Sequence, residues 1–147
     1  MKLTLMLADS AQAVQGKLYI LGGGWDTTMV DPNGFVPPSA LAALIRVPWD
    51  LANAPHRATF RLLDADGQVV TADGEPVEMH NDFEAGRPPG TPAGADLPIP
   101  IVWSLGPRPM DLGRYTWSLT VDDEVIWSTE VAFTVRSHDP SFPGPAD

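Results

Sequence analysis

The residues best suited to chemistry in this sequence are the carboxylates and the single histidine of residues 62–86. That stretch contains seven acidic residues and no lysine or arginine. Carboxylate oxygens are the ligands that Ca²⁺ prefers, and an imidazole among carboxylates also suits another metal or an acid–base pair. The candidate metal ligands are therefore Asp64, Asp66, Glu78, His80 and Asp82, and calcium is the one cofactor that the sequence suggests.

A structural interpretation of the same residues is simpler. Alternation along a strand puts Glu78, His80 and Asp82 on one face, which is the composition expected for the water-facing side of an antiparallel sheet. Residues 64–67 begin like a calcium loop, but the remaining ligands and the terminal glutamate of an EF-hand do not follow. We therefore expect no resident cofactor, and a calcium- or metal-binding domain, or a metal-dependent enzyme, that uses the acidic residues of 64–84 is an alternative.

Two tryptophans are candidates for binding a sugar or another small molecule. Trp25 and Trp49 fall at the expected ends of strands, whereas the other three tryptophans lie on the apolar side of theirs and are expected in the core.

The glycine triplet at 22–24 lacks the helix and the lysine of a phosphate loop, so we expect a strand end or a close backbone approach there. No serine lies in a nucleophile-elbow motif, and we predict no catalytic residue.

Short strands separated by Gly, Pro and Asp must position all of these residues. The longest alternation covers residues 114–135, where we expect a hairpin with a two-residue turn at Asp122 and Asp123 and with Val125 and Trp127 on its apolar face. Pro100 predicts that its strand is an edge strand or begins after it. Other strands are expected at residues 2–8, 16–21, 41–47, 57–63, 68–71, 77–83 and 99–105, with an irregular loop at 86–98. The pattern predicts an all-β fold, an antiparallel β-sandwich of immunoglobulin-like or jelly-roll-like type with eight to nine short strands and little helix.

The chain of 147 residues has the size of one domain. We expect a single sandwich over residues 1–136 and a Pro-rich irregular tail over residues 137–147. The apolar run at residues 3–8 is shorter than a signal-peptide core and alternates like a strand, and no apolar run approaches the ~20 residues of a membrane helix. The absence of cysteine excludes disulfides and favours a cytoplasmic location.

The charge of the chain restricts its partners. With a net charge of −10 and nine scattered basic residues, we expect neither nucleic acid nor a membrane as a partner. The irregular loop and tail would gain order by docking on a neighbour, so we expect a protein partner or a homo-oligomer. The sequence therefore favours a non-catalytic sandwich that acts by self-association or protein–protein interaction. A small-molecule or carbohydrate-binding module that uses Trp25 and Trp49 is an alternative.

Two segments resemble known families. Residues 7–11 (LADSA) followed by residues 16–25 (GKLYILGGGW) are similar to the start of a bacterial family of domains of unknown function, whose members are small, stand-alone proteins predicted to be β-sandwiches. This resemblance covers about the first quarter of the chain and implies no site residues. Residues 112–135 resemble the last hairpin of immunoglobulin-like sandwich domains, which implies an architecture and no activity.

Overall fold

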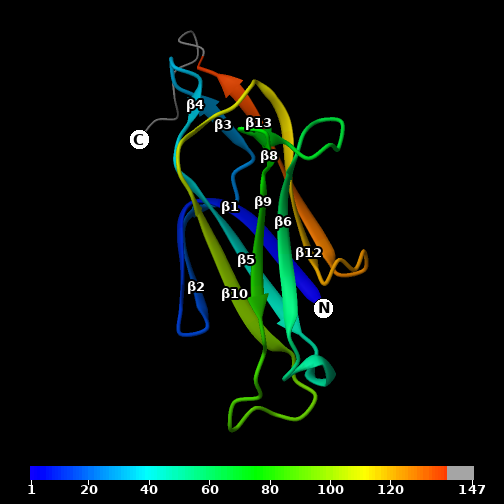
Figure 1. Ribbon diagram of the computed structural model, residues 1–147. Coiled ribbons are helices and arrows are strands. Elements are labelled where there is room, and N and C mark those ends of the chain that lie inside the picture. Colours follow the sequence, from blue (N-terminus) through cyan, green and yellow to red (C-terminus); the bar gives the residue numbers. More distant parts are fainter. Residues whose placement is uncertain (139–147) are drawn as a thin grey trace.

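The computed structural model describes residues 1–138, which form two β-sheets packed face to face (Figure 1). The four-stranded sheet has the order β10 (Leu97–Leu105), β5 (Ser39–Val47), β1 (Lys2–Val14) and β2 (Lys17–Gly23). The five-stranded sheet has the order β3 (Thr27–Val30), β13 (Ser128–Ser137), β12 (Gly113–Val121), β6 (His56–Leu63) and β9 (Glu78–Phe83). All neighbours are antiparallel except β3 and β13, which run parallel. The predicted all-β sandwich is confirmed.

Alternation along the strands fills the space between the sheets. Leu7 and Leu41 of the four-stranded sheet meet Phe60, Trp117 and Leu119 of the five-stranded sheet in one buried cluster. Each such side chain contributes roughly 1.5–3 kcal/mol by leaving water.

The terminal hairpin corrects the sequence prediction at its turn. The hairpin forms between β12 and β13, but residues 122–127 connect the two strands, so the predicted two-residue turn at Asp122 and Asp123 is wrong. Both aspartates have positive φ angles of 53° and begin the turn, and backbone hydrogen bonds from Glu124 N to Val121 O and from Trp127 N to Glu124 O continue it. Val125, predicted on the apolar face, is therefore 86% exposed, whereas Trp127 packs against the core.

One other prediction differs at a strand boundary, and one is confirmed. Residues 64–67 form the predicted turn, closed by the Asp64 carboxylate, but the expected strand at 68–71 is reduced to one bridge between Leu63 and Val69. The chain instead forms the short pair β7 (Thr71–Ala72) and β8 (Glu75–Pro76). Pro100 does lie in an edge strand, because β10 pairs with β5 alone among the described strands.

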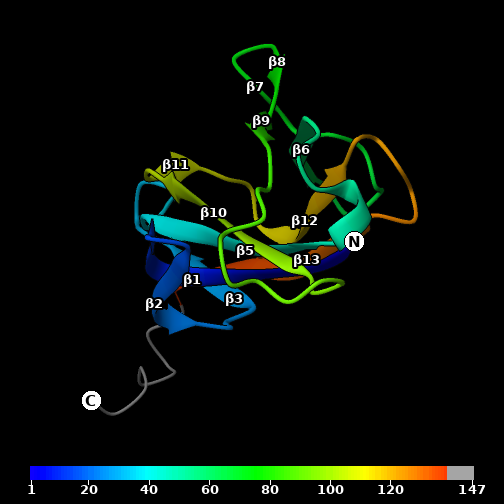
Figure 2. The same ribbon diagram turned by 90° about the horizontal axis from the view of Figure 1, so that it is seen from below.

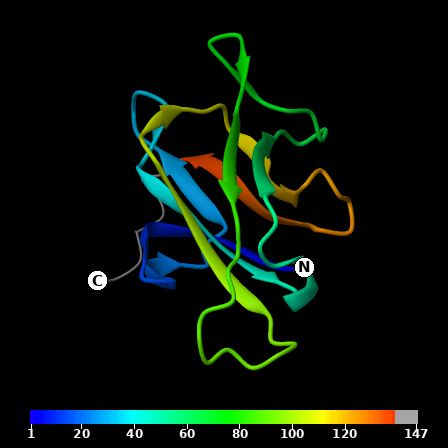
Figure 3. The ribbon, with the colours of Figure 1, turned by 60° about the horizontal axis from the view of Figure 1, so that its bottom comes forward.

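Two connections close the ends of the sandwich. A 3-10 helix, η1 (Trp49–Leu51), lies beside the long loop between β9 and β10, and Figure 3 shows both at the lower end. At the other end β4 (Phe35–Val36) pairs with β11 (Arg108–Pro109). Tyr115, near the start of β12, donates a hydrogen bond to the Asp111 carbonyl at 2.9 Å, a feature shared with the tyrosine corner of immunoglobulin-like sandwiches.

The structure describes all of the predicted domain, residues 1–136, but little of the predicted tail. Of the tail predicted over residues 137–147, residues 139–147 lie outside the described part of the chain. In the part that is described, no helix has the length and apolar character needed to cross a membrane.

Candidate functional site

The β1–β2 hairpin is built by a tight turn. Gln15 and Gly16, the two residues between the strands, have φ angles of 51° and 75°. Two consecutive residues with positive φ are typical of a type I′ turn, whose twist matches that of the flanking strands. The turn sets the register, in which Ser10 lies opposite Leu21 and Gln12 opposite Tyr19.

One face of this hairpin forms part of the outer side of the four-stranded sheet. There a second apolar cluster, separate from the core, joins Ala11 and Ile20 of the hairpin to Ala40 and Ala42 of β5. Gly23 makes this packing possible, since a Cβ at this position would come within 2.7 Å of the Ile20 Cγ2 atom. The predicted close backbone approach at the glycine triplet is confirmed.

The other face of the hairpin exposes apolar side chains to solvent. Leu21 is 73% exposed and Tyr19 is 56% exposed, and Val14 is also exposed. Residues 10–25 contain no acidic residue and only one charge, that of Lys17, although the whole chain has a net charge of −10. The hairpin is therefore the apolar and non-acidic part of an acidic molecule.

The edges of the two sheets differ in how they are protected against pairing with another chain. Proteins commonly block an edge with proline, with charged side chains or by keeping the strand short. β10 contains Pro98 and Pro100, β9 presents the carboxylates of Glu78 and Asp82 and the imidazole of His80, and β3 has only four residues. β2 has seven residues, no proline and one charge, and among the described strands it pairs only with β1 (Figures 1 and 2). β2 is therefore the unprotected edge of the sandwich.

The predicted metal ligands of β9 lie on one outward face, as expected, but β6 supplies partners for them. The register places Arg57 opposite Asp82 and Arg61 opposite Glu78. Arg57 Nε donates to Asp82 Oδ1 at 2.7 Å, and this contact lowers the pKa of the Asp82 carboxyl. Arg61 Nε donates to Glu78 Oε2 at 3.1 Å. Glu78 and Asp82, two of the three candidate metal ligands on β9, are therefore engaged in cross-strand ion pairs.

His80, the third candidate ligand on this face of β9, also has partners in the protein. Its Nε2 atom lies 2.9 Å from Glu78 Oε1, and its Nδ1 atom lies 3.1 Å from the Thr59 hydroxyl oxygen. Asp64 accepts hydrogen bonds from the backbone N–H groups of Asp66 and Gln68, so its carboxylate holds its own turn. Within residues 1–138, no group of three or more His, Asp or Glu side chains is arranged to hold a metal ion. The calcium site stays a prediction, and the pairing of β6 with β9 is what sequence reasoning missed.

The two tryptophans proposed as ligand-binding residues lie in different places. Trp49, in η1, packs under the Arg87 guanidinium, whose carbon lies 4.3 Å from the ring centroid, and Arg87 also donates to the Trp49 carbonyl. Trp25, between β2 and β3, is half-buried against the core at the end closed by β4 and β11. The structure therefore does not bring Trp25 and Trp49 into one site.

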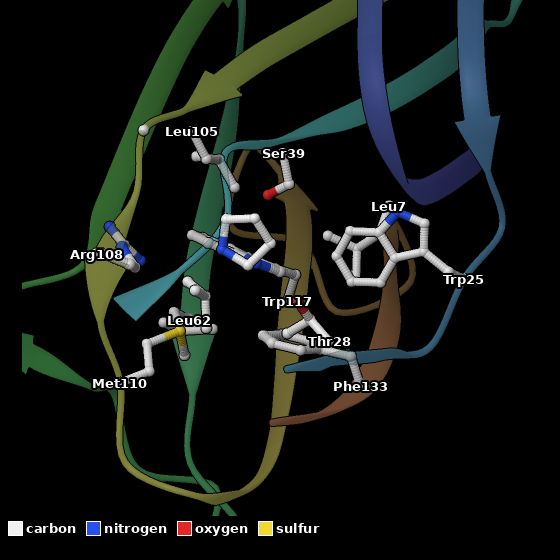
Figure 4. A pocket seen from close by; sticks show the side chains of 13 residues that line it. Leu7, Trp25, Thr28, Ser39, Leu62, Leu105, Arg108, Met110, Trp117 and Phe133 are labelled. Atoms are coloured by element: carbon white, nitrogen blue, oxygen red, sulfur yellow. The ribbon is translucent and has the colours of Figure 1, made fainter. Parts of the chain in front are cut away.

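Trp25 instead lines a hollow together with an arginine that sequence reasoning did not single out. Figure 4 shows Trp25 on one side of this hollow and Arg108 on the other, with the Ser39 hydroxyl between them. The hollow holds about 20 Å³, which is room for about one water molecule. The Trp25 indole nitrogen is buried and has no hydrogen-bond partner among the described residues.

Comparison with known proteins places the chain in a family. A search of proteins with curated functions found no match. The profile of a family of unknown function (DUF6941) matches residues 3–135, which include every strand of both sheets except the last residues of β13 and the first of β1. The chain therefore belongs to this family of unknown function, DUF6941.

Proposed function

We propose that this protein is a non-catalytic interaction module that self-associates through the free edge of β2. The observation that carries the proposal is the contrast between β2 and the other three edge strands. β10, β9 and β3 each have a feature that opposes pairing, and β2 has only the single charge of Lys17, its first residue. An exposed apolar edge of this kind is a template for addition of another strand.

A second copy of the chain fits this edge. In antiparallel pairing about a twofold axis at Ile20, the midpoint of β2, Tyr19 of one protomer lies opposite Leu21 of its partner, and the reverse pair follows by symmetry. Aromatic–aliphatic cross-strand pairs contribute roughly 0.2–1 kcal/mol each relative to alanine pairs. Lys17 would lie opposite Gly23, so no like charges meet. The four-stranded sheets of two protomers would then form one continuous sheet.

The first prediction tests this edge with Leu21→Lys. Sedimentation velocity over a concentration series should show reversible dimers of the unaltered protein. The variant should weaken the dimer at least tenfold, about 1.4 kcal/mol, because it removes the apolar contact of both Tyr19–Leu21 pairs and brings two lysines, one from each protomer, close together on the same face of the sheet. Leu21 is largely exposed, so the melting temperature should change little.

Ile126→Lys is the matched control. Ile126 is 80% exposed in the loop between β12 and β13, and the substitution adds the same charge away from β2. The control should dimerise like the unaltered protein. A monomeric unaltered protein at high micromolar concentration, or equal weakening by both variants, would contradict the proposal.

The alternatives depend on other parts of the molecule. A cytoplasmic setting fits a cysteine-free chain and belongs to the same proposal. Binding of a small molecule is favoured by a separate observation at Arg108, which does not depend on β2.

A further inference from the structure

Arg108 differs from the other arginines in its surroundings. Arg57 and Arg61 pair with carboxylates, Arg87 stacks on Trp49, and Arg114 donates to the Thr134 hydroxyl. Arg46 and Arg136 are exposed to water. Arg108 is partly buried, and it has neither an ion pair nor a side-chain hydrogen bond with any residue of the described chain. Burial lowers the pKa of its guanidinium, and no neighbouring anion offsets this effect.

The backbone holds Arg108 where two hollows meet. Arg108 lies opposite Val36 in the β11–β4 pair, which crosses the end of the sandwich. The inner hollow is the water-sized space beside Trp25 (Figure 4). On its other side Arg108 lines a groove of about 590 Å³ that opens to solvent, and Leu62 and Met110 line both spaces. A groove of this volume is in the range of small-molecule sites.

The lining of the groove restricts the chemistry of a ligand. Its apolar walls come from Leu62, Val70, Val77 and Met110, and its polar rim includes Asn33 and Thr71. This combination suits a ligand with an apolar body and one polar end.

Charge restricts the ligand further. Arg108 is the one cation that lines the groove within the described residues, whereas Asp73 and Asp111 lie on the rim. A guanidinium matches a carboxylate with two parallel hydrogen bonds. A dianion such as phosphate would leave one charge unmatched near two aspartates, so a monoanion is favoured.

We propose that this groove binds a small organic monocarboxylate, with its carboxylate on the Arg108 guanidinium and its apolar body against the walls of the groove. A guanidinium held partly out of water without a counter-charge destabilises the folded protein. Ligand sites commonly retain such groups at the expense of stability. Ligand binding at Arg108 does not depend on dimerisation at β2, because β2 belongs to the four-stranded sheet and Arg108 to the β11–β4 pair.

Isothermal titration with phenylacetate tests the proposal, and phenylacetamide and inorganic phosphate serve as comparisons. Phenylacetate should bind saturably, and both comparison compounds should bind at least tenfold more weakly. Arg108→Met keeps an unbranched apolar stem without the guanidinium and its charge, and should weaken phenylacetate binding at least tenfold. Arg46→Met removes the same charge from an exposed position on β5 and should leave the affinity within twofold.

The stability of the unliganded variant separates binding from a structural role. Arg108→Met should melt at the same temperature as the unaltered protein or higher, because it removes an unmatched charge. Arg108→Lys keeps the charge but not the planar guanidinium that donates two parallel hydrogen bonds. This variant should bind phenylacetate several-fold more weakly. A lower melting temperature for Arg108→Met, equal binding of phenylacetamide, tighter binding of phosphate, or no saturation by phenylacetate up to millimolar concentration would each overturn the proposal.

Discussion

At the scale of single residues, His56 links three segments at the lower end of the sandwich. Its buried ring lies between two acceptors, with Nδ1 2.6 Å from Asp122 Oδ2 and Nε2 3.0 Å from the Leu51 carbonyl oxygen. The other oxygen of Asp122 accepts the Arg57 backbone N–H at 2.8 Å. Burial by itself would lower the pKa of His56, but the hydrogen bonds to Leu51 and Asp122 outweigh burial and raise the pKa above its ordinary value of 6.5. The protonated ring donates from both nitrogens.

This arrangement predicts a pH dependence of stability. Because the folded-state pKa of His56 is raised, its contribution is fully present below about pH 6.5, the unfolded-state value, and is lost as the pH rises through the folded-state value. Urea denaturation at about pH 6 and about pH 8.5 should show a larger stability difference between the unaltered protein and His56→Gln at the lower pH. An equal difference at both pH values would show that the pKa of His56 is the same in the folded and the unfolded protein, and a smaller difference at the lower pH would show that the folded ring is neutral.

At the scale of elements, the β1–β2 hairpin depends on glycine for both its direction and its packing. Gly22 has a φ of 61° and Gly24 a φ of 89°, so the chain turns at the end of β2 in conformations that disfavour side chains. Gly23, between them, lies against Ile20 and Met6. The hairpin can therefore cover the alanines of β5 only while these positions stay small.

Substitution at Gly23 should loosen the hairpin. Gly23→Ala places a Cβ within 2.7 Å of Ile20 Cγ2 and 3.1 Å of Met6 Sδ, and overpacking of this kind costs about 1–3 kcal/mol. The free energy of unfolding from urea titration measures the loss. Gly86→Ala is the control, since its Cβ would meet nothing within 4 Å and its φ is not positive, and it should be nearly neutral. Equal stability of the two variants would show that Ile20 moves aside freely.

At the scale of the whole molecule, net charge opposes the proposed dimer. Each copy carries a net charge of −10, whereas the β2 edge has no acidic residue. Repulsion between two copies is therefore spread over their surfaces and is screened by salt. Raising sodium chloride from about 0.02 M to about 0.3 M, which shortens the screening length below ~10 Å, should tighten the dimer several-fold in sedimentation experiments. Weaker association at high salt would instead indicate an interface made of ion pairs.

Strand positions were predictable where one face of a strand enters the core. Alternation in β1, β6 and β12 reports burial directly, since every second residue leaves water, whereas β5 is buried on both faces from Ala40 to Ala43. The hairpin loop at 122–127 was not predictable in this way. Val125 continues the alternation in the sequence, but two aspartates in the left-handed region start a longer turn before the strand resumes.

The amino-acid sequence by itself determined an acidic, all-β sandwich, because side-chain burial on a pleated strand is a local pattern of period two. It also placed Glu78, His80 and Asp82 on one face, which local geometry decides. Only the tertiary structure decided that Arg57 and Arg61 lie across from these groups, that β2 is the unprotected edge, and that Arg108 lies partly buried without an ionic partner among residues 1–138. These features depend on which strands become neighbours, and strand order follows from packing between residues far apart in the chain.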